Sequence, residues 1–242
     1  RDSVLLAEKL GVDTITCFSG CPGDHDEALH PNWICVGQAE MGEVLDWQWN
    51  SVVIPYWQDF VPFARKHGVT KIAIEMYASM VVYNTETLMR LRNAVGTEIG
   101  CNFDPTHLVW QGMKPVTVIN ALGDAIYHVH GKDSYPNKNV IAVNGILDQR
   151  PYWGDERNRA WFFRTSGYGF STIEWKNMIN ALLTVGFNGT VSIEHEDSLM
   201  NQMEGLRKAV AFFKDIIPFE ETSALEWRDS INEMIYNIEH AK

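Results

Sequence analysis

The sequence predicts an α/β fold of the (β/α)8 barrel type, with the first strand, helix and second strand missing from this chain. Short apolar segments alternate with helix-like segments along most of its length. Polar residues stand at the ends of several apolar segments, separated by 29, 26 and 64 residues: Glu75, Asp104, His130 and Glu194. A strand and its helix take roughly 25–35 residues in a parallel barrel, so these intervals correspond to one, one and two repeats.

Six segments are expected to be strands. Several are almost entirely apolar, which is typical of parallel strands that are covered on both faces. The predicted strands span residues 14–18, 71–75, 98–103, 125–130, 160–164 and 190–194.

Helices are expected between the strands, and two of them carry clear end signals. Ser171 and Glu174 form a capping-box pattern before an apolar helical segment, and Gly186 is expected to end that helix. An earlier helix over residues 5–10 is expected to end at Gly11 in the same way.

Six strands are two fewer than a closed barrel of this kind needs. The chain begins at Arg1, without Met and inside a predicted helix. We therefore expect a first strand, its helix and a second strand to precede it. This divides the chain into an N-terminally incomplete barrel over residues 1–217 and a C-terminal helical extension over residues 218–242.

The extension is expected to contain a helix over residues 223–240 with one apolar stripe. Trp227, Ile231, Ile235 and Ile238 recur there at helical spacing. The stripe needs a partner surface, either the bottom of the barrel or a neighbouring subunit, and we favour a homo-oligomer.

Composition favours a globular enzyme of the cytoplasm. Hydrophobic residues make up 45% of the chain, enough for one large core. No apolar run approaches the roughly 20 residues that span a bilayer, so no membrane role is expected. The net charge of −11 argues against a nucleic-acid partner, because phosphate binding needs clustered Lys and Arg. The four cysteines lack a zinc-binding spacing and are expected to be thiols in a reducing compartment.

The polar residues at the strand ends form a typical ligand set for one divalent cation. Residues at the carboxyl ends of barrel strands converge on one mouth. Three carboxylates and one imidazole favour a hard ion, with Mn²⁺ preferred and Mg²⁺, Co²⁺ or Zn²⁺ as alternatives. His128 shares a strand face with His130, and His130 is the expected ligand because it lies nearer the end of the strand.

Six stretches carry a more specific signal: FSGCPGD (18–24), IEMYASMVVYN (74–84), NFDPTHLVWQG (102–112), YHVHGKD (127–133), FRTSGYG (163–169) and SIEHEDSLM (192–200). In this order they resemble the sugar phosphate isomerase/epimerase family of xylose isomerase-like TIM barrels. The resemblance covers about residues 4–215.

The resemblance implies roles for particular residues. Glu75, Asp104, His130 and Glu194 would hold the metal. The two glutamates would also exchange a substrate proton, one on each face of the carbon beside a carbonyl. His107 would lie beside the metal, near a substrate hydroxyl.

The chain departs from the family pattern at Tyr77-Ala78-Ser79, where His-Pro-Gly is expected. If that histidine acts as an acid or base in relatives, the chemistry of this protein differs or is weaker.

The predicted function is a divalent-metal-dependent isomerase or epimerase of a sugar, keto-sugar or polyol derivative. A metal ion that chelates a carbonyl and a neighbouring hydroxyl stabilises an enediolate, and Glu75 and Glu194 are the expected proton carriers. His107, Lys132 and Arg164 are expected to bind the substrate or stabilise its oxyanions. Arg164 could equally be a structural ion-pair partner.

Three other functions stay open. The first is the catalytic subunit of a metal-dependent lyase that cleaves C-glycosides of 3-oxo-sugars with a small β-rich partner subunit, because the same enolate chemistry would serve it. The second is a barrel subunit that has lost activity, which the Tyr77 departure favours. The third is a metal phosphodiesterase resembling endonuclease IV, which the net charge and the single imidazole disfavour.

Overall fold

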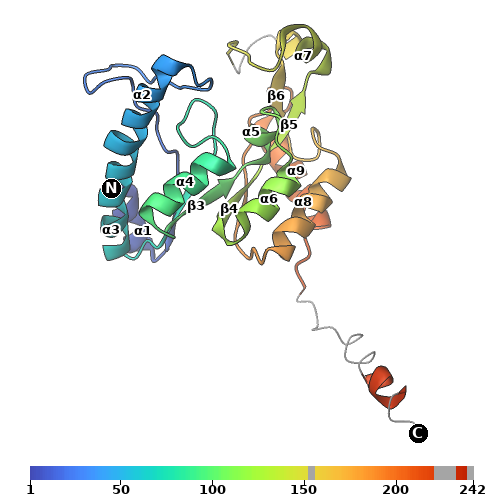
Figure 1. The fold of residues 1–242 in the computed structure, drawn as a ribbon. Helices are drawn as coiled ribbons and strands as arrows, with labels where there is room; N and C mark the ends of the chain where they lie inside the picture. The colour runs from blue at the N-terminus through green and yellow to red at the C-terminus, as the bar shows by residue number, and fades with distance from the viewer. Residues whose placement is uncertain (152–155, 221–232, 239–242) are drawn as a thin grey trace.

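The computed structural model describes residues 1–151, 156–220 and 233–238. Its centre is a parallel sheet of five strands in the order β1-β2-β3-β4-β7 (Figure 1). The strands are β1 (Thr14–Cys17), β2 (Lys71–Glu75), β3 (Ile99–Phe103), β4 (Ile126–Gly131) and β7 (Val191–Ile193).

The strand order is that of a barrel, because each new strand is added beside the previous one in a single direction. Crossovers between parallel strands are right-handed, so strands added in one direction place their connecting helices on the same face of the sheet. The helices that pack there are α1 (Asp2–Leu10), α3 (Ile54–Lys66), α4 (Thr85–Val95), α6 (Pro115–Leu122), α8 (Thr172–Thr184) and α9 (Gln202–Ile216). The main hydrophobic core lies between these helices and the sheet.

A long helical segment after β1 fixes the loop that precedes it. Helix α2 (Ala39–Trp47) continues through a π-helical turn (Gln48–Val53) into α3. The buried Gln48 amide nitrogen lies 3.1, 2.8 and 2.8 Å from the carbonyl oxygens of Pro22, Gly23 and Asn32. The loop between β1 and α2 is therefore tied to this helix.

The helix-end predictions are confirmed. Helix α1 ends at Gly11, whose φ of 68° is the left-handed conformation that glycine adopts readily. Helix α8 begins after Ser171, and Ser171 and Glu174 form the reciprocal hydrogen bonds of a capping box. The chain leaves this helix through Gly186, with φ of 81°.

The strand predictions hold except at residues 160–164. That segment forms β6 (Trp161–Arg164), but its expected place in the parallel sheet is wrong. It pairs antiparallel with β5 (Asp133–Pro136), and β7 pairs directly with β4. The reason is that β5 leaves the end of β4 almost at once and gives β6 a partner outside the sheet.

The strands β5 and β6, together with α7 (Lys138–Asn144), extend beyond the carboxyl ends of the sheet strands (Figure 1). A second, smaller core holds this arm against the short helix α5 (Pro105–Val109) and the loop after β2. It consists of Ala78, Trp110, Ala160, Trp161 and Phe163.

The predicted C-terminal helix is only partly within the described residues. Residues 233–238 are helical, and Ile235 and Ile238 are exposed there. The other residues of the predicted apolar stripe lie outside the described residues.

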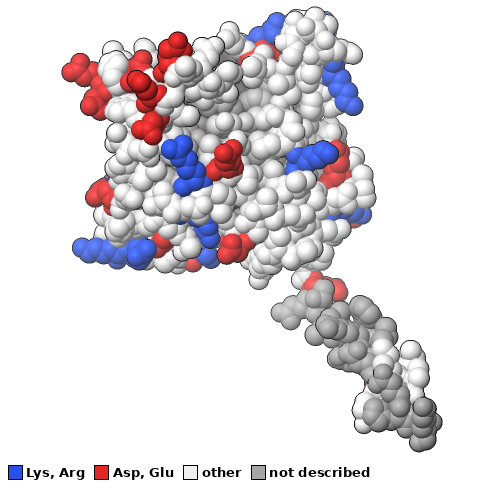
Figure 2. All heavy atoms as spheres, in the orientation of Figure 1, with Lys and Arg blue, Asp and Glu red and all other residues white. Residues whose placement is uncertain are grey.

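Acidic side chains dominate part of the surface. Figure 2 shows them gathered near α2 and the loop before it, where the exposed acidic residues are Asp24, Asp26, Glu27, Glu40, Glu43 and Asp46. Among the described residues, no helix combines the length and the apolar character that crossing a membrane requires.

Candidate metal centre

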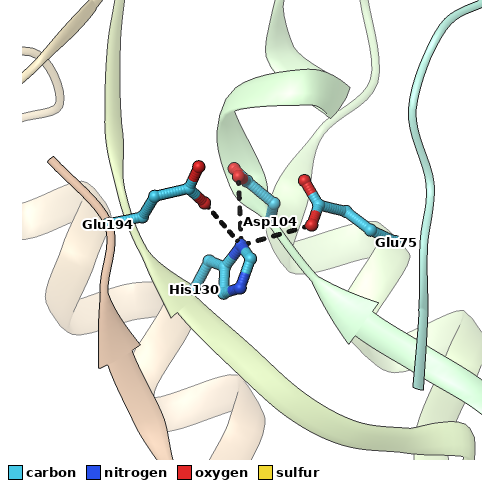
Figure 3. Close-up of side chains that lie close together, drawn as sticks. All are labelled: Glu75, Asp104, His130 and Glu194. Atoms are coloured by element: carbon cyan, nitrogen blue, oxygen red, sulfur yellow. Dashed lines mark ion pairs between the residues drawn. The ribbon is translucent and has the colours of Figure 1, made fainter. Parts of the chain in front are cut away.

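Four potential metal ligands converge at the carboxyl ends of the sheet strands (Figure 3). Glu75 is the last residue of β2, Asp104 follows β3, His130 lies near the end of β4, and Glu194 follows β7. Each offers one ligand atom, and these atoms lie within 4.8 Å of one another. The convergence follows from the parallel arrangement, because the strand ends meet at one edge of the sheet.

The imidazole of His130 lies at the centre of this cluster. Its Nδ1 atom is 2.8 Å from Glu194 Oε2, 3.4 Å from Glu75 Oε2 and 3.6 Å from Asp104 Oδ2. Figure 3 shows the two glutamates reaching it from opposite sides, with Asp104 between them. Three carboxylates from three different strand ends thus surround one ring nitrogen.

Helix capping uses one carboxylate oxygen of Asp104 and leaves the other oriented towards the cluster. Asp104 caps α5, and its Oδ1 accepts hydrogen bonds from the Thr106 backbone nitrogen (2.8 Å) and hydroxyl (2.6 Å). Its Oδ2, His130 Nδ1 and Glu194 Oε2 are buried, and the two oxygens lie in ion-pair contact with Nδ1 at 3.6 and 2.8 Å, without a well-directed hydrogen bond in the described part of the chain. Polar atoms that are buried without well-directed hydrogen bonds are unfavourable. A divalent cation would satisfy all three atoms, so this donor set fits a metal ion.

The charges in the cluster are strongly coupled. Burial opposes the charged form of His130, but contacts with Asp104 and Glu194 and the charge of Glu75 raise its pKa to about 10. Burial also opposes ionisation of Glu194, yet His130 and Lys132 hold the pKa of that carboxyl below its usual value. Without a metal, a proton on His130 therefore supplies part of the positive charge that these carboxylates require.

His107 lies directly against two of the potential ligands. It is only 1% exposed, and its Nε2 is 3.1 Å from Glu75 Oε1 and 3.4 Å from Asp104 Oδ2. The structure thus brings this predicted substrate-binding residue into the cluster. The ring of Tyr77 packs edge-on against His107 with a centroid distance of 4.4 Å. A tyrosine ring thus lies beside His107 at the position where the family pattern predicts a second histidine.

Lys132 also lies in the cluster. Its Nζ is 2.8 Å from Glu196 Oε2, 3.0 Å from Glu194 Oε1 and 3.9 Å from Asp104 Oδ2, and it sits 4.0 Å from the ring centre of Phe163. Burial opposes its charge, but these carboxylates raise its pKa above the usual value. Lys132 is therefore a fixed cation beside Glu194.

Arg164 is held elsewhere. Its guanidinium pairs with Glu156 and, at 3.3 Å, with Asp197. No ion pair or hydrogen bond joins it to the four clustered residues in the described part of the chain. These contacts tie β6 to the segment after β7 and favour the structural alternative for Arg164, while substrate binding stays a prediction.

Sequence reasoning missed Asn102. Its Nδ2 lies 3.1 Å from Glu75 Oε2 and 3.0 Å from His130 Nε2, so it bridges two of the potential ligands. The Nδ2 group donates to the Glu75 carboxylate, and its contact with His130 Nε2 depends on which ring nitrogen carries the proton. The available signal was a polar residue inside the otherwise apolar strand β3.

His128 lies outside the cluster. Its Nε2 is 2.7 Å from Ser192 Oγ, and burial together with the nearby His130 lowers its pKa. The structure therefore groups His130, and not His128, with the three carboxylates.

Comparison with known proteins defines the class. Residues 1–216 match the xylose isomerase-like TIM barrel family, and the chain belongs to that family. The predicted resemblance and fold are thereby confirmed. The chain is 41% identical over 215 residues to the uncharacterized protein YfiH of Bacillus subtilis (strain 168), an alignment that covers 88% of this chain and 68% of YfiH.

Two solved structures share the fold. One is the IOLI protein with a bound zinc atom, which is 17% identical, with a TM-score of 0.59 and coverage of 89% of this chain and 66% of that one. The other is D-psicose 3-epimerase determined in the presence of D-fructose, which is 13% identical, with a TM-score of 0.53 and coverage of 89% and 68%. The chain thus spans about two thirds of the length of these relatives.

Proposed function

We propose that this protein is a divalent-metal-dependent isomerase or epimerase of a sugar, keto-sugar or polyol derivative. One observation carries the proposal: Glu75 and Glu194 approach the same atom, His130 Nδ1, from opposite sides of the cluster, at 3.4 and 2.8 Å. Two carboxylates arranged in this way can face the two sides of one substrate carbon.

The chemistry follows from that arrangement. A divalent ion held by Glu75, Asp104, His130 and Glu194 would supply Lewis-acid polarisation of a substrate carbonyl. One glutamate removes the proton from the carbon beside the carbonyl, and the other returns a proton. Return to the opposite face of that carbon gives the epimer, and return to the neighbouring carbon gives the isomer.

The surrounding residues have supporting roles in this proposal. Lys132 is placed beside Glu194 to stabilise negative charge on a substrate oxygen. His107, 3.1 Å from Glu75 Oε1, orients that carboxylate and offers a donor to a substrate hydroxyl.

The ligand set favours Mn²⁺, because three carboxylates and one imidazole suit a hard ion that also accepts nitrogen. The zinc in the IOLI protein supports Zn²⁺ as an alternative on this fold. The sugar named for the epimerase relative supports a carbohydrate substrate.

The test is metal analysis followed by proton exchange. Elemental analysis of the purified protein should find one divalent ion per chain. The metal-loaded protein in D₂O, incubated with a panel of ketoses and 3-oxo-glycosides, should incorporate deuterium beside the carbonyl of at least one member, as seen by NMR. Chelator-treated protein is the control.

The outcomes separate the candidate functions. Exchange without bond cleavage supports the isomerase or epimerase. Cleavage of a 3-oxo-glycoside would instead show the lyase. A fully metal-loaded protein that exchanges no proton in any member would contradict both.

A further inference from the structure

A cavity of about 520 Å³, within the size range of small-molecule binding sites, lies next to the end of α5. Trp33, Trp110 and Trp161 line it, together with residues of the loop after β2 and of the segment after α7. Trp110 ends α5, Trp161 belongs to β6, and Trp33 lies in the loop that Gln48 ties to the long helix. Three separate segments thus contribute one tryptophan each.

Helix α5 and its C-cap residue contribute to both the metal centre and the cavity. His107 and Trp110 are three residues apart at α5, so they lie on adjacent turns about 4.5 Å apart along the helix axis. The ring of Phe163 is 5.7 Å from that of His107 and 5.5 Å from that of Trp161. Trp161 in turn stacks on Trp110 at 4.6 Å and 6°. Phe163 thus lies between His107 at the metal centre and Trp161 at the cavity.

The cavity offers hydrogen-bond donors as well as aromatic surface. The indole nitrogens of Trp33 and Trp110 are buried, and neither has an acceptor among the described residues. A buried donor without an acceptor is unfavourable, and a ligand oxygen would satisfy it. Aromatic rings with a polar edge suit a ligand that is apolar on one face and hydroxylated at its rim.

Charge around the cavity does not favour a phosphate. Among the described lining residues, the charged ones are Asp148 and Arg150, and Arg150 Nη1 lies 3.1 Å from Asp148 Oδ1. Phosphate recognition relies on cationic or multiple backbone donors that are available to it, whereas this cation is already paired. The lining is therefore matched to a neutral ligand.

The wall contributed by the loop after β2 is strained. Ser79 has φ of 72°, and it is the one non-glycine residue with positive φ among those described. Such backbone conformations persist where the surrounding structure enforces them, often at binding sites. Ser79 lines the cavity and follows Glu75 by four residues in the sequence, so one loop leads from the metal centre to this lining.

We propose that this cavity binds the second sugar ring of a glycosidic substrate whose first ring reacts at the metal centre. The substrate class is then a neutral disaccharide-like glycoside, not a free or phosphorylated monosaccharide. This inference rests on the proposed function for the identity of the first ring.

Binding can be tested apart from catalysis. The full chain with Mg²⁺, which leaves NMR signals sharp, is titrated with cellobiose, maltose and lactose, and with glucose, galactose, glucose 6-phosphate and phenyl β-glucoside. Saturation-transfer NMR should show contacts to both rings of at least one disaccharide. That disaccharide should bind about tenfold more tightly than its monosaccharide, the gain expected from one aromatic platform.

Variants locate the second ring. Trp33→Ala should remove the tenfold preference and leave monosaccharide binding unchanged, because Trp33 does not touch the metal centre. Trp33→Phe should keep most of the preference, since it keeps an aromatic face. Tyr56→Ala, which removes an exposed ring outside the cavity, is the matched control. Thermal melts establish that each variant is folded.

Several results would overturn the inference. The first is equal affinity for disaccharides and monosaccharides, and the second is an equal loss of affinity for disaccharides and for monosaccharides in Trp33→Ala. Binding of phenyl β-glucoside but of no disaccharide, tighter binding of glucose 6-phosphate than of the neutral sugars, or binding of none of these sugars would also contradict it. Trp33-dependent disaccharide binding without proton exchange in any sugar would refute the proposed function and leave the subsite standing. Proton exchange confined to monosaccharides would support the proposed function and refute the second sugar subsite.

Discussion

His130 Nδ1 lies 2.8 Å from Glu194 Oε2, and this contact joins β4 to the strand that pairs with it directly, β7. Neighbouring strands lie about 4.8 Å apart, and an intervening strand would double that separation. The departure of β6 from the sheet therefore brings Glu194 next to the imidazole. The candidate metal centre depends on this strand pairing as much as on the four clustered residues themselves.

The two glutamates should be essential for proton exchange. Glu75→Gln and Glu194→Gln each remove a negative ligand and a base, and we expect each to lower the exchange rate at least about 100-fold while the fold is retained. Deuterium incorporation by NMR measures the rate. Glu196→Gln is the matched control, because Glu196 contacts Lys132 but offers no ligand to the cluster. Wild-type exchange in either variant at full metal occupancy would remove that glutamate from the mechanism.

The histidines should differ in their effect on metal affinity. Outer-shell changes usually cost roughly 10–100-fold in affinity. His130→Ala should exceed that range, whereas His128→Ala should stay within or below it, because His128 bonds to Ser192 outside the cluster. Asp104→Asn should also weaken binding, since Oδ2 becomes a neutral group. Metal titration that ranked His128 above His130 would show that the ligand is the other histidine.

The sequence predicted the sheet well because several of its strands are almost entirely apolar, and it located the cluster because barrel strands end at one mouth. It could not predict that β6 pairs outside the sheet. Its partner β5 is the short segment Asp133–Pro136, which contains Asp and Pro and lacks a strand pattern. Asn102 was missed for a related reason, because its contacts with Glu75 and His130 join residues that are distant in sequence.

Metal binding should release a proton. The pKa of His130 is raised to about 10 in the metal-free protein, and a metal ligand must be unprotonated. Below pH 10 the cation displaces this proton, so the apparent affinity should rise about tenfold per pH unit. Calorimetry in buffers of different ionisation enthalpy counts the released protons. Metal binding without proton release would be inconsistent with His130 Nδ1 as a ligand.

The stability of the chelator-treated protein should show the opposite dependence on pH. The folded-state pKa of His130 lies above the ordinary value of 6.5, so its contribution to stability is complete below pH 6.5 and is lost as pH rises towards 10. Urea unfolding at pH 7 and pH 9 should therefore give a smaller free energy of unfolding at pH 9. The difference in unfolding free energy between pH 7 and pH 9 should shrink in His130→Asn, because asparagine cannot bind the proton. An unchanged difference would assign the pH dependence of stability to another group.

Asp133 should be the residue that holds the arm above the metal centre in place. Its buried carboxylate accepts hydrogen bonds from the backbone nitrogens of Gly167 (2.7 Å), Gly169 (3.2 Å) and Phe170 (2.7 Å), and from Trp175 Nε1 (3.3 Å). Burial raises its pKa to about 6 against these hydrogen bonds, so most of the Asp133 carboxyl is ionised at pH 7 and the donors face a negative charge.

Asp133→Asn tests this role, because it replaces one acceptor oxygen with an NH₂ group that faces N–H donors. Each unsatisfied donor costs about 1–3 kcal/mol, so we expect a loss of about 2–4 kcal/mol in the free energy of unfolding by urea. Amide hydrogen exchange should accelerate first at Gly167, Gly169 and Phe170, because their amide groups donate to the Asp133 carboxylate. Asp124→Asn is the control, since the Asp124 side chain is 94% exposed and should change stability little. An Asp133→Asn variant as stable as the wild type would mean that the N–H groups do not need the charge, and that packing of Phe170 and Trp175 holds the arm instead.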